Sequence, residues 1–241
     1  MEATRTPARL ADHEKSRFLG RTYGWMAFAL CLSAVAAFFT ASYEPLLRFL
    51  FATGQSGRPI GFIALVIVEL VLVFALTATI RKISVFTAVL GFVLYAVING
   101  MTLSSIFIVY KISSIAMAFF STAILFSVMS LYGMFTKRNL ASWGRYLMMA
   151  LLGVIIASVV GGIISFVTKT PLNMLDILVS IAIVVIFTLL TAYDSQKLIK
   201  TAEHARDTAD YKKVAILAAL ELYLDFINLL LALLRLFGKK R

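Results

Sequence analysis

Charged residues are scarce in this chain of 241 residues: 23 Lys and Arg and 12 Asp and Glu make up only 15% of it. Hydrophobic residues account for 61%, against about 45–50% in an ordinary soluble domain. This composition excludes a soluble globular protein. The single cysteine, Cys31, excludes an intramolecular disulfide and a cysteine metal cluster. Only His13 and His204 are histidines, so neither a histidine metal site nor a Ser-His-Asp triad is expected.

The apolar residues fall into seven long runs. A bilayer core of about 30 Å needs about 20 apolar residues to cross it, and the runs cover residues 24–42, 61–80, 83–110, 112–136, 146–168, 177–193 and 214–234. As one helix, the stretch 83–136 would be about 80 Å long, so we predict a turn around Lys111, Ser113 and Ser114. The sequence therefore predicts an all-α polytopic membrane protein with seven transmembrane helices.

The basic residues predict how the chain is oriented. With the N-terminus in the cytoplasm, 15 of the Lys and Arg residues lie on that side and 8 on the other, as the positive-inside rule requires. We expect a cytoplasmic tail at 1–23, the transmembrane domain at 24–237 and a basic tail at 238–241. Seven spans put this last tail outside. An alternative with six spans and a re-entrant last segment returns it to the cytoplasm.

The same residues bear on partners and location. They lie between apolar runs rather than on a stripe interleaved with aromatic residues, so we expect no nucleic-acid partner. No segment with the form of a signal peptide precedes the first run. This favours a bacterial inner membrane, with the endoplasmic reticulum as the alternative. The expected partners are the lipid bilayer, Ca²⁺ and H⁺, with membrane proteins as further candidates.

Four acidic residues fall inside or at the ends of the runs: Glu69, Asp194, Glu221 and Asp225. An acid at the bilayer centre costs about 2.5–3.5 kcal/mol on insertion scales, so it usually faces a cavity or a partner. Asp194 closes the sixth run and Asp225 lies in the middle of the seventh. They meet if the sixth helix continues into the following loop. Glu221 lies one helical turn before Asp225, on the same face.

Two facing carboxylates in a dry site predict a proton-sensitive gate. They cannot both ionise cheaply, so they share a proton or bind a cation. When protonated, the pair closes as a hydrogen bond. When deprotonated, the two carboxylates repel each other or recruit Ca²⁺, which prefers oxygen ligands. The alternative is that each acid is satisfied separately by Asn, Ser, Tyr or water, and for Glu69 the sequence indicates no partner.

The last run carries the most specific motif. Residues 219–229 read ALELYLDFINL, with Leu-Leu-Arg at 233–235, and this resembles the last-helix signature of the Bax inhibitor-1 (transmembrane Bax inhibitor motif) family. Tyr193-Asp194 and the segment NGMTLS at 99–104 resemble the same family. The resemblance implies a seven-helix fold whose last helix is central.

The resemblance also implies a function, a pH-sensitive calcium leak governed by an aspartate pair. Here that pair would be Asp194 and Asp225, as gate and tentative Ca²⁺ ligands, with Glu221 as a neighbouring ligand. Family members carry a basic residue near the end of the second helix that pairs with the aspartates. Arg81 is the candidate for this latch, and the alternative is that Arg81 is a positive-inside anchor.

Other classes of function fit less well. Intramembrane aspartyl proteases of the presenilin type carry Gly-x-Gly-Asp at the second aspartate, whereas residues 222–225 read LYLD. A retinal protein needs a lysine in the middle of its seventh helix, and residues 214–234 contain none. We therefore expect no enzyme and no cofactor. The main alternative is a non-transporting regulator that binds a membrane protease or cell-death proteins, and a third possibility is Ca²⁺ exchange coupled to protons.

Overall fold

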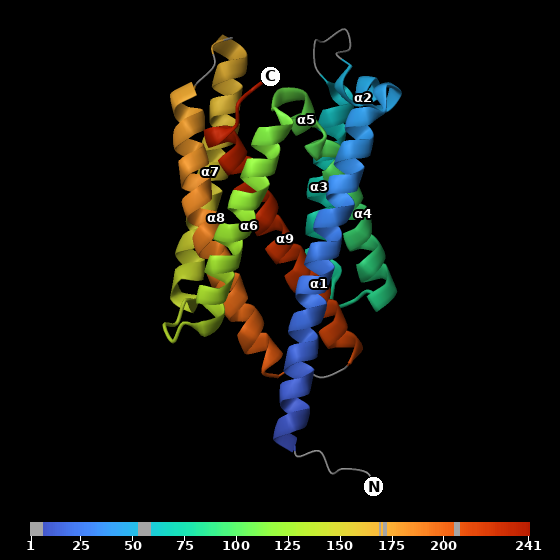
Figure 1. Cartoon of the computed structure of the whole chain (residues 1–241), viewed down its shortest axis with the longest axis vertical. Coiled ribbons are helices and arrows are strands. Elements are labelled where there is room, and N and C mark those ends of the chain that lie inside the picture. Colours follow the sequence, from blue (N-terminus) through green and yellow to red (C-terminus); the bar gives the residue numbers. More distant parts are fainter. Residues whose placement is uncertain (1–6, 53–58, 169, 171–172, 205–207) are drawn as a thin grey trace. The chain divides into compact units, whose positions relative to one another are not determined.

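The computed structural model describes residues 7–52, 59–168, 170, 173–204 and 208–241, and Figure 1 shows the course of the chain. Within these residues there are nine helices and no strand. The helices are α1 Pro7–Ser42, α2 Glu44–Phe51, α3 Ile60–Thr79, α4 Val85–Leu103, α5 Ser105–Val109, α6 Ile112–Phe135, α7 Ala141–Thr168, α8 Asn173–Ala202 and α9 Ala209–Phe237. Seven segments are long and apolar enough to span a membrane, with α4 and α5 together forming one of them. The predicted fold class is confirmed.

The helices extend past the apolar runs at their polar ends. The first helix begins at Pro7, inside the segment predicted as a tail, and α8 continues to Ala202. Hydropathy detects only the part of a helix that crosses lipid, whereas Ala, Lys and Glu residues favour helix in water as well. The predicted continuation of the sixth helix into the following loop is therefore confirmed.

The helical structure of the long stretch 83–136 is interrupted where the sequence predicted a turn. The helix α4 ends at Leu103. The N–H group of the next residue, Ser104, donates to the carbonyls of Gly100, at 3.1 Å, and Met101, at 3.2 Å. After the short helix α5, Tyr110 adopts an extended conformation, and α6 begins at Ile112. The break expected around Lys111 is confirmed, whereas Ser113 and Ser114 lie in the first turn of α6.

The short helix α2 was not predicted. Its eight residues include Pro45 in the first turn, and Arg48 pairs with Glu44 at 2.6 Å, one helical turn away. Gly61 at the start of α3 lies against Leu50, where an added Cβ would come within 2.8–2.9 Å of the α2 backbone. A search for runs of about 20 apolar residues overlooks so short a helix.

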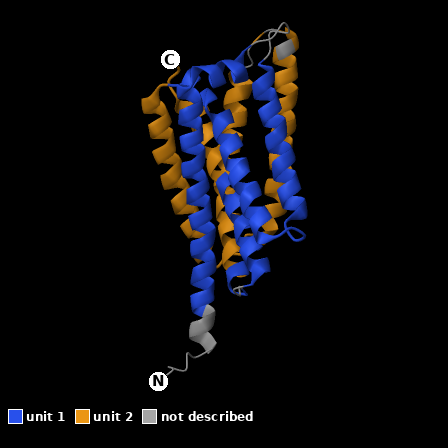
Figure 2. Cartoon of the chain, turned by 90° about the vertical axis from the view of Figure 1, so that its right-hand side faces the viewer, with its two compact units in different colours: residues 1–110, 201–223, 241 blue, residues 111–200, 224–240 orange. Residues whose placement is uncertain are grey.

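The chain divides into two compact units (Figure 2). Unit 1 comprises residues 1–110, 201–223 and 241, and unit 2 comprises residues 111–200 and 224–240. In unit 1, α1 and α3 both pack along α4. The helix α9 contributes its first half to unit 1 and its second half to unit 2. Of the seven candidate spans it is the most buried, since 61% of the residues in its most apolar stretch are buried. This burial is expected for a central last helix.

The C-terminal tail lies beside the turn between α5 and α6. The N–H group of Lys239 donates to Oγ of Ser114 at 3.0 Å, and the N–H group of Lys111 donates to the carbonyl of Lys239 at 3.1 Å. The helix that leads to this tail has 29 residues, or about 44 Å, and is long enough to cross the membrane. The seven-span arrangement is therefore preferred over the re-entrant alternative.

This arrangement predicts which residues are accessible from the same side of the membrane. In a Cys31→Ser background, we expect Lys111→Cys and Lys240→Cys to react with an impermeant thiol reagent from one side of sealed vesicles. Lys82→Cys, in the turn between α3 and α4, should react only from the other side. Labelling of Lys240→Cys from the side of Lys82→Cys would contradict a seventh complete span.

Candidate functional site

The two predicted gating aspartates belong to the same compact unit. Asp194 lies on α8 and is half-buried, whereas Asp225 lies on α9 and is only 4% exposed. Both are in unit 2. Burial of an ionised carboxylate is expensive unless it is neutralised or well hydrogen-bonded. The buried carboxyl group of Asp225 therefore needs hydrogen-bonding or neutralising partners.

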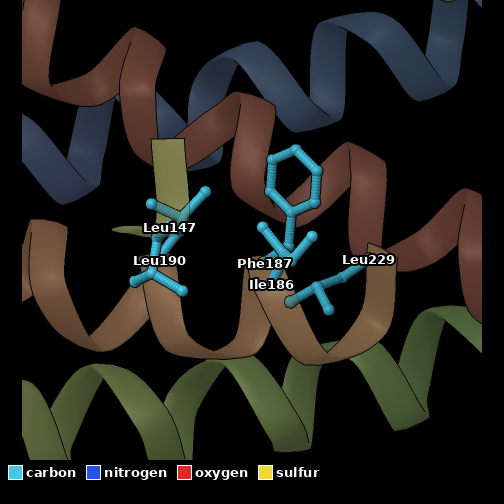
Figure 3. Close-up of a cluster of buried hydrophobic side chains, with 5 residues drawn as sticks. All are labelled: Leu147, Ile186, Phe187, Leu190 and Leu229. Atoms are coloured by element: carbon cyan, nitrogen blue, oxygen red, sulfur yellow. The ribbon is translucent and has the colours of Figure 1, made fainter. Parts of the chain in front are cut away.

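A layer of apolar side chains joins the two helices one turn away from the aspartates. Leu190 of α8 and Leu229 of α9 belong to one buried cluster with Leu147, Ile186 and Phe187 (Figure 3). Leu190 precedes Asp194 by four residues, and Leu229 follows Asp225 by four. Because successive membrane-spanning helices run in opposite directions, both aspartates lie on the same side of this layer.

The helix α6 contacts both aspartate-bearing turns on one of its faces. Phe126 contacts Phe226, the neighbour of Asp225, with ring centroids 5.7 Å apart. One turn further along α6, Ser130 accepts a hydrogen bond of 3.0 Å from Ser195, the neighbour of Asp194. Phe126 and Ser130 are both buried. Phe226 also contacts Phe119, with ring centroids 5.5 Å apart, so the turn that carries Asp225 packs along α6 between Phe119 and Phe126. The two turns therefore share one face of α6, about one to three helical turns apart along its axis.

Two glycines let neighbouring helices approach the turn that carries Asp194. An added Cβ at Gly133 of α6 would overlap the carbonyl oxygen of Ala192 and lie 2.8 Å from its carbonyl carbon. An added Cβ at Gly144 of α7 would come within 2.6–2.9 Å of the Tyr193 ring. The residues on the N-terminal side of Asp194 are thus tightly held.

Gln196, two residues after Asp194, holds the loop between α6 and α7. Its side-chain carbonyl accepts from the N–H group of Leu140 at 2.9 Å, and its amide donates to the carbonyl of Arg138 at 2.7 Å. Gln196 is 7% exposed. The turn of α8 that carries Asp194 is therefore anchored on both sides of the aspartate.

This anchor predicts a loss of stability when Gln196 is replaced. Gln196→Leu leaves two backbone groups of the loop without partners, and we expect it to lower the free energy of unfolding by about 1–3 kcal/mol. Lys200→Met, one turn later, removes an exposed hydrogen bond to Asn139 and should change stability by less than about 1 kcal/mol. Thermal unfolding in mild detergent measures both, and equal effects would contradict the anchoring role.

The other predicted site residues lie in unit 1. Glu221 is half-buried on α9, and Arg81 is exposed in the turn after α3. The carbonyl of Arg81 accepts a hydrogen bond of 3.1 Å from Nζ of Lys213, which also pairs with Asp210 at 3.0 Å. The backbone of Arg81 thus helps to anchor the start of α9. Its role as a latch stays a prediction.

Sequence reasoning overlooked the partners of Glu69. Its carboxylate accepts hydrogen bonds from the side chains of Asn99 and Thr102 on α4. The available signal was the spacing of these two residues, three apart and therefore on one face of the third span. Nothing in that spacing identified Glu69 as the residue facing them.

Comparison with known proteins gives one family over nearly the whole chain. The sequence profile described as "Inhibitor of apoptosis-promoting Bax1" matches residues 15–241. The inner membrane protein YbhL of Escherichia coli K12 is 43% identical over 226 residues, covering 93% of this chain and 92% of YbhL. Uncharacterized proteins of Borreliella burgdorferi and Rickettsia prowazekii are 41% and 38% identical, and the matches cover 94% and 95% of this chain and 94% and 92% of theirs.

Proposed function

This chain belongs to the Bax inhibitor-1 family of multi-pass membrane proteins, and we propose that it is a passive, pH-sensitive Ca²⁺ leak gated by Asp194 and Asp225. The observation that carries the proposal is the shared packing of the two aspartate-bearing turns. Ser195 contacts Ser130 and Phe226 contacts Phe119 and Phe126 on one face of α6, which supports placing the two neighbouring carboxylates on the same side of α6.

The gate follows from the electrostatics of two close carboxylates. With one proton between them, a hydrogen bond holds α8 and α9 together, which we assign to the closed state. Loss of that proton leaves two negative charges in a poorly solvated place. They either repel each other or bind a cation, and in both cases the closed contact is broken.

The residues around the pair suit a permeant ion rather than a stored one. Among the described residues, no group of three or more His, Cys, Asp or Glu side chains is placed to hold a metal. Ca²⁺ takes 6–8 oxygen ligands in its stable protein sites. Two carboxylates completed by water would hold it weakly, as passage requires, with Glu221 proposed as a further ligand along α9.

The seven spans indicate that the protein lies in a lipid bilayer. The description of a relative supports a proposal of which membrane this is. YbhL is described as an inner membrane protein, and we propose a bacterial inner membrane for this chain too. The positive-inside distribution of Lys and Arg supports a cytoplasmic N-terminus.

Reconstitution tests the proposed function directly. Purified protein in liposomes loaded with a Ca²⁺ indicator should give an influx above that of empty liposomes, and the influx should rise between about pH 5 and pH 8. An influx that carries protons outward in proportion to Ca²⁺ would instead indicate exchange. No influx at any pH would overturn the leak and favour the regulator that binds membrane proteins.

A further inference from the structure

A second group of buried polar side chains crosses unit 1, away from the proposed gate. It joins Ser33 of α1, Glu69 of α3, Asn99 of α4 and Tyr223 of α9, which are 1%, 8%, 8% and 0% exposed. All four lie in segments that are apolar enough to span a membrane. Buried polar groups at this depth are costly, so their arrangement points to a function.

These side chains form a continuous chain of close polar contacts. The amide Nδ2 of Asn99 donates to Oε2 of Glu69 at 3.2 Å, and the hydroxyl of Tyr223 donates to Oδ1 of Asn99 at 2.7 Å. The same tyrosine oxygen lies 2.7 Å from Oγ of Ser33. Oγ of Ser33 in turn lies 2.7 Å from the carbonyl oxygen of Ala96 on α4. Gly100, against Ser33, permits this approach of α1 to α4.

With Oδ1 of Asn99 facing Tyr223, this hydrogen-bond network has one hydrogen too few for its contacts. Three contacts of 2.7 Å join oxygen to oxygen: Asn99 to Tyr223, Tyr223 to Ser33, and Ser33 to Ala96. Only the hydroxyls of Tyr223 and Ser33 can supply hydrogens to them. Oγ of Ser33 also lies 2.9 Å from the carbonyl of Ala29, which adds another acceptor. At least one pair of oxygens is therefore in close contact without a hydrogen between them.

Rotation of the Asn99 amide by half a turn removes the shortage. The oxygen and nitrogen of an asparagine side chain are nearly isosteric, and their assignment follows from the hydrogen-bond network. After rotation, Nδ2 donates to Tyr223, Tyr223 donates to Ser33, and Ser33 donates to Ala96. Oδ1 of Asn99 then faces Oε2 of Glu69, a contact that needs a hydrogen. A protonated Glu69 supplies it.

We propose that Glu69 is a proton-binding site separate from the aspartate pair, and that binding of the proton reverses the hydrogen-bond chain that runs through Asn99 and Tyr223 to Ser33. In the loaded state every donor points from Glu69 towards the carbonyl of Ala96. The chain connects α1, α3, α4 and α9 within unit 1, so the proton sets the direction of the polar contacts that join these four helices.

Within unit 1, a proton is the partner that can neutralise the charge of Glu69. Two titratable groups face it, Tyr95 from α4 and Tyr223 from α9, and phenols are neutral at physiological pH. On α2, Glu44 and Arg48 pair with each other at the surface. No basic side chain in the described part of unit 1 forms an ion pair with Glu69. A neutral acid is also cheaper than a carboxylate in an apolar environment.

Infrared spectroscopy of the protein in lipid tests the proposal through the C=O stretch of a protonated carboxyl. The measurement uses an Asp225→Asn background, so that the aspartate pair contributes no shared proton. We expect a protonated-carboxyl band that weakens as the pH is raised and disappears in Glu69→Gln. Glutamine keeps the shape of the acid and donates to Asn99, so this variant should fold. Persistence of the same band in Glu69→Gln would overturn the assignment.

A second pair of variants tests the chain itself. In the orientation with deprotonated Glu69, the Tyr223 hydroxyl belongs to the group of oxygens that lacks a hydrogen, so Tyr223→Phe relieves that shortage and removes the advantage of the rotated Asn99. The ratio of protonated to deprotonated Glu69 at a given pH should therefore fall roughly 2- to 10-fold, the effect of one hydrogen bond. Tyr95→Phe is the matched control, because Tyr95 is also buried and contacts the Tyr223 ring, with centroids 6.0 Å apart, but takes no part in the hydrogen-bond network from Glu69 to Ser33. If this ratio changed equally in both variants, or did not change in Tyr223→Phe, the proposed hydrogen-bond network would be contradicted.

Discussion

Asp225→Asn is expected to keep the Ca²⁺ flux at its acidic level across the range from about pH 5 to pH 8. Asparagine keeps the shape of the acid and can donate a hydrogen bond to Asp194 in the proposed pair, but it removes the charge whose repulsion opens the gate. At the alkaline end the flux should fall about tenfold or more relative to the unmodified protein. This factor corresponds to an interaction between two carboxylates that changes the proton affinity of one of them tenfold.

The control for this prediction is the same substitution outside the pair. Asp176→Asn lies in the first turn of α8, where the side chain is exposed, and it should leave the pH profile unchanged. If both variants shift the profile alike, the effect arises from net charge rather than from the gate. A normal profile in Asp225→Asn would remove Asp225 from the gate.

Gly133→Ala is expected to destabilise the protein by about 2–3 kcal/mol, within the usual range for overpacking. The added methyl group would overlap the backbone of Ala192, and its distance to the Cα atom of that residue would be 2.9 Å. Backbone cannot rotate away as a side chain can. Either α6 moves away from α8 or the turn that carries Asp194 shifts, so the Ca²⁺ flux should change together with stability.

Gly153→Ala on α7 is the matched control. No atom lies within 4 Å of a Cβ added at Gly153, among the residues that the structure describes, and alanine favours a helix over glycine by about 1 kcal/mol. Thermal unfolding in detergent should therefore show unchanged or slightly raised stability for Gly153→Ala. Equal melting of the two variants would contradict the close approach of α6 and α8.

Hydropathy predicted the number of spans because the free energy of crossing lipid is a local property of each segment. The turn at Lys111 followed from length alone, since 54 residues cannot form one span. The start of α1 at Pro7 and the short helix α2 were not predicted. Both contain polar residues, and their helical state depends on hydrogen bonding and packing rather than on transfer into lipid.

The candidate site was predictable only in part. A carboxylate in an apolar run is visible in the sequence, and so is the shared face of Glu221 and Asp225. The common contact of two turns with α6 is not visible, because Phe126 and Ser130 become neighbours of α9 and α8 only through tertiary packing. The same holds for Glu69, whose partner Asn99 is 30 residues away along the chain.

The most direct test of the central claim is a double-mutant cycle on the pH dependence of Ca²⁺ flux in liposomes, with Asp194→Asn, Asp225→Asn and the two combined. If the aspartates act as one proton-sharing gate, either single substitution should abolish the pH dependence, and the double variant should show no further loss. Effects that add in the double variant, or a flux whose pH dependence survives both substitutions, would contradict an aspartate pair as the gate.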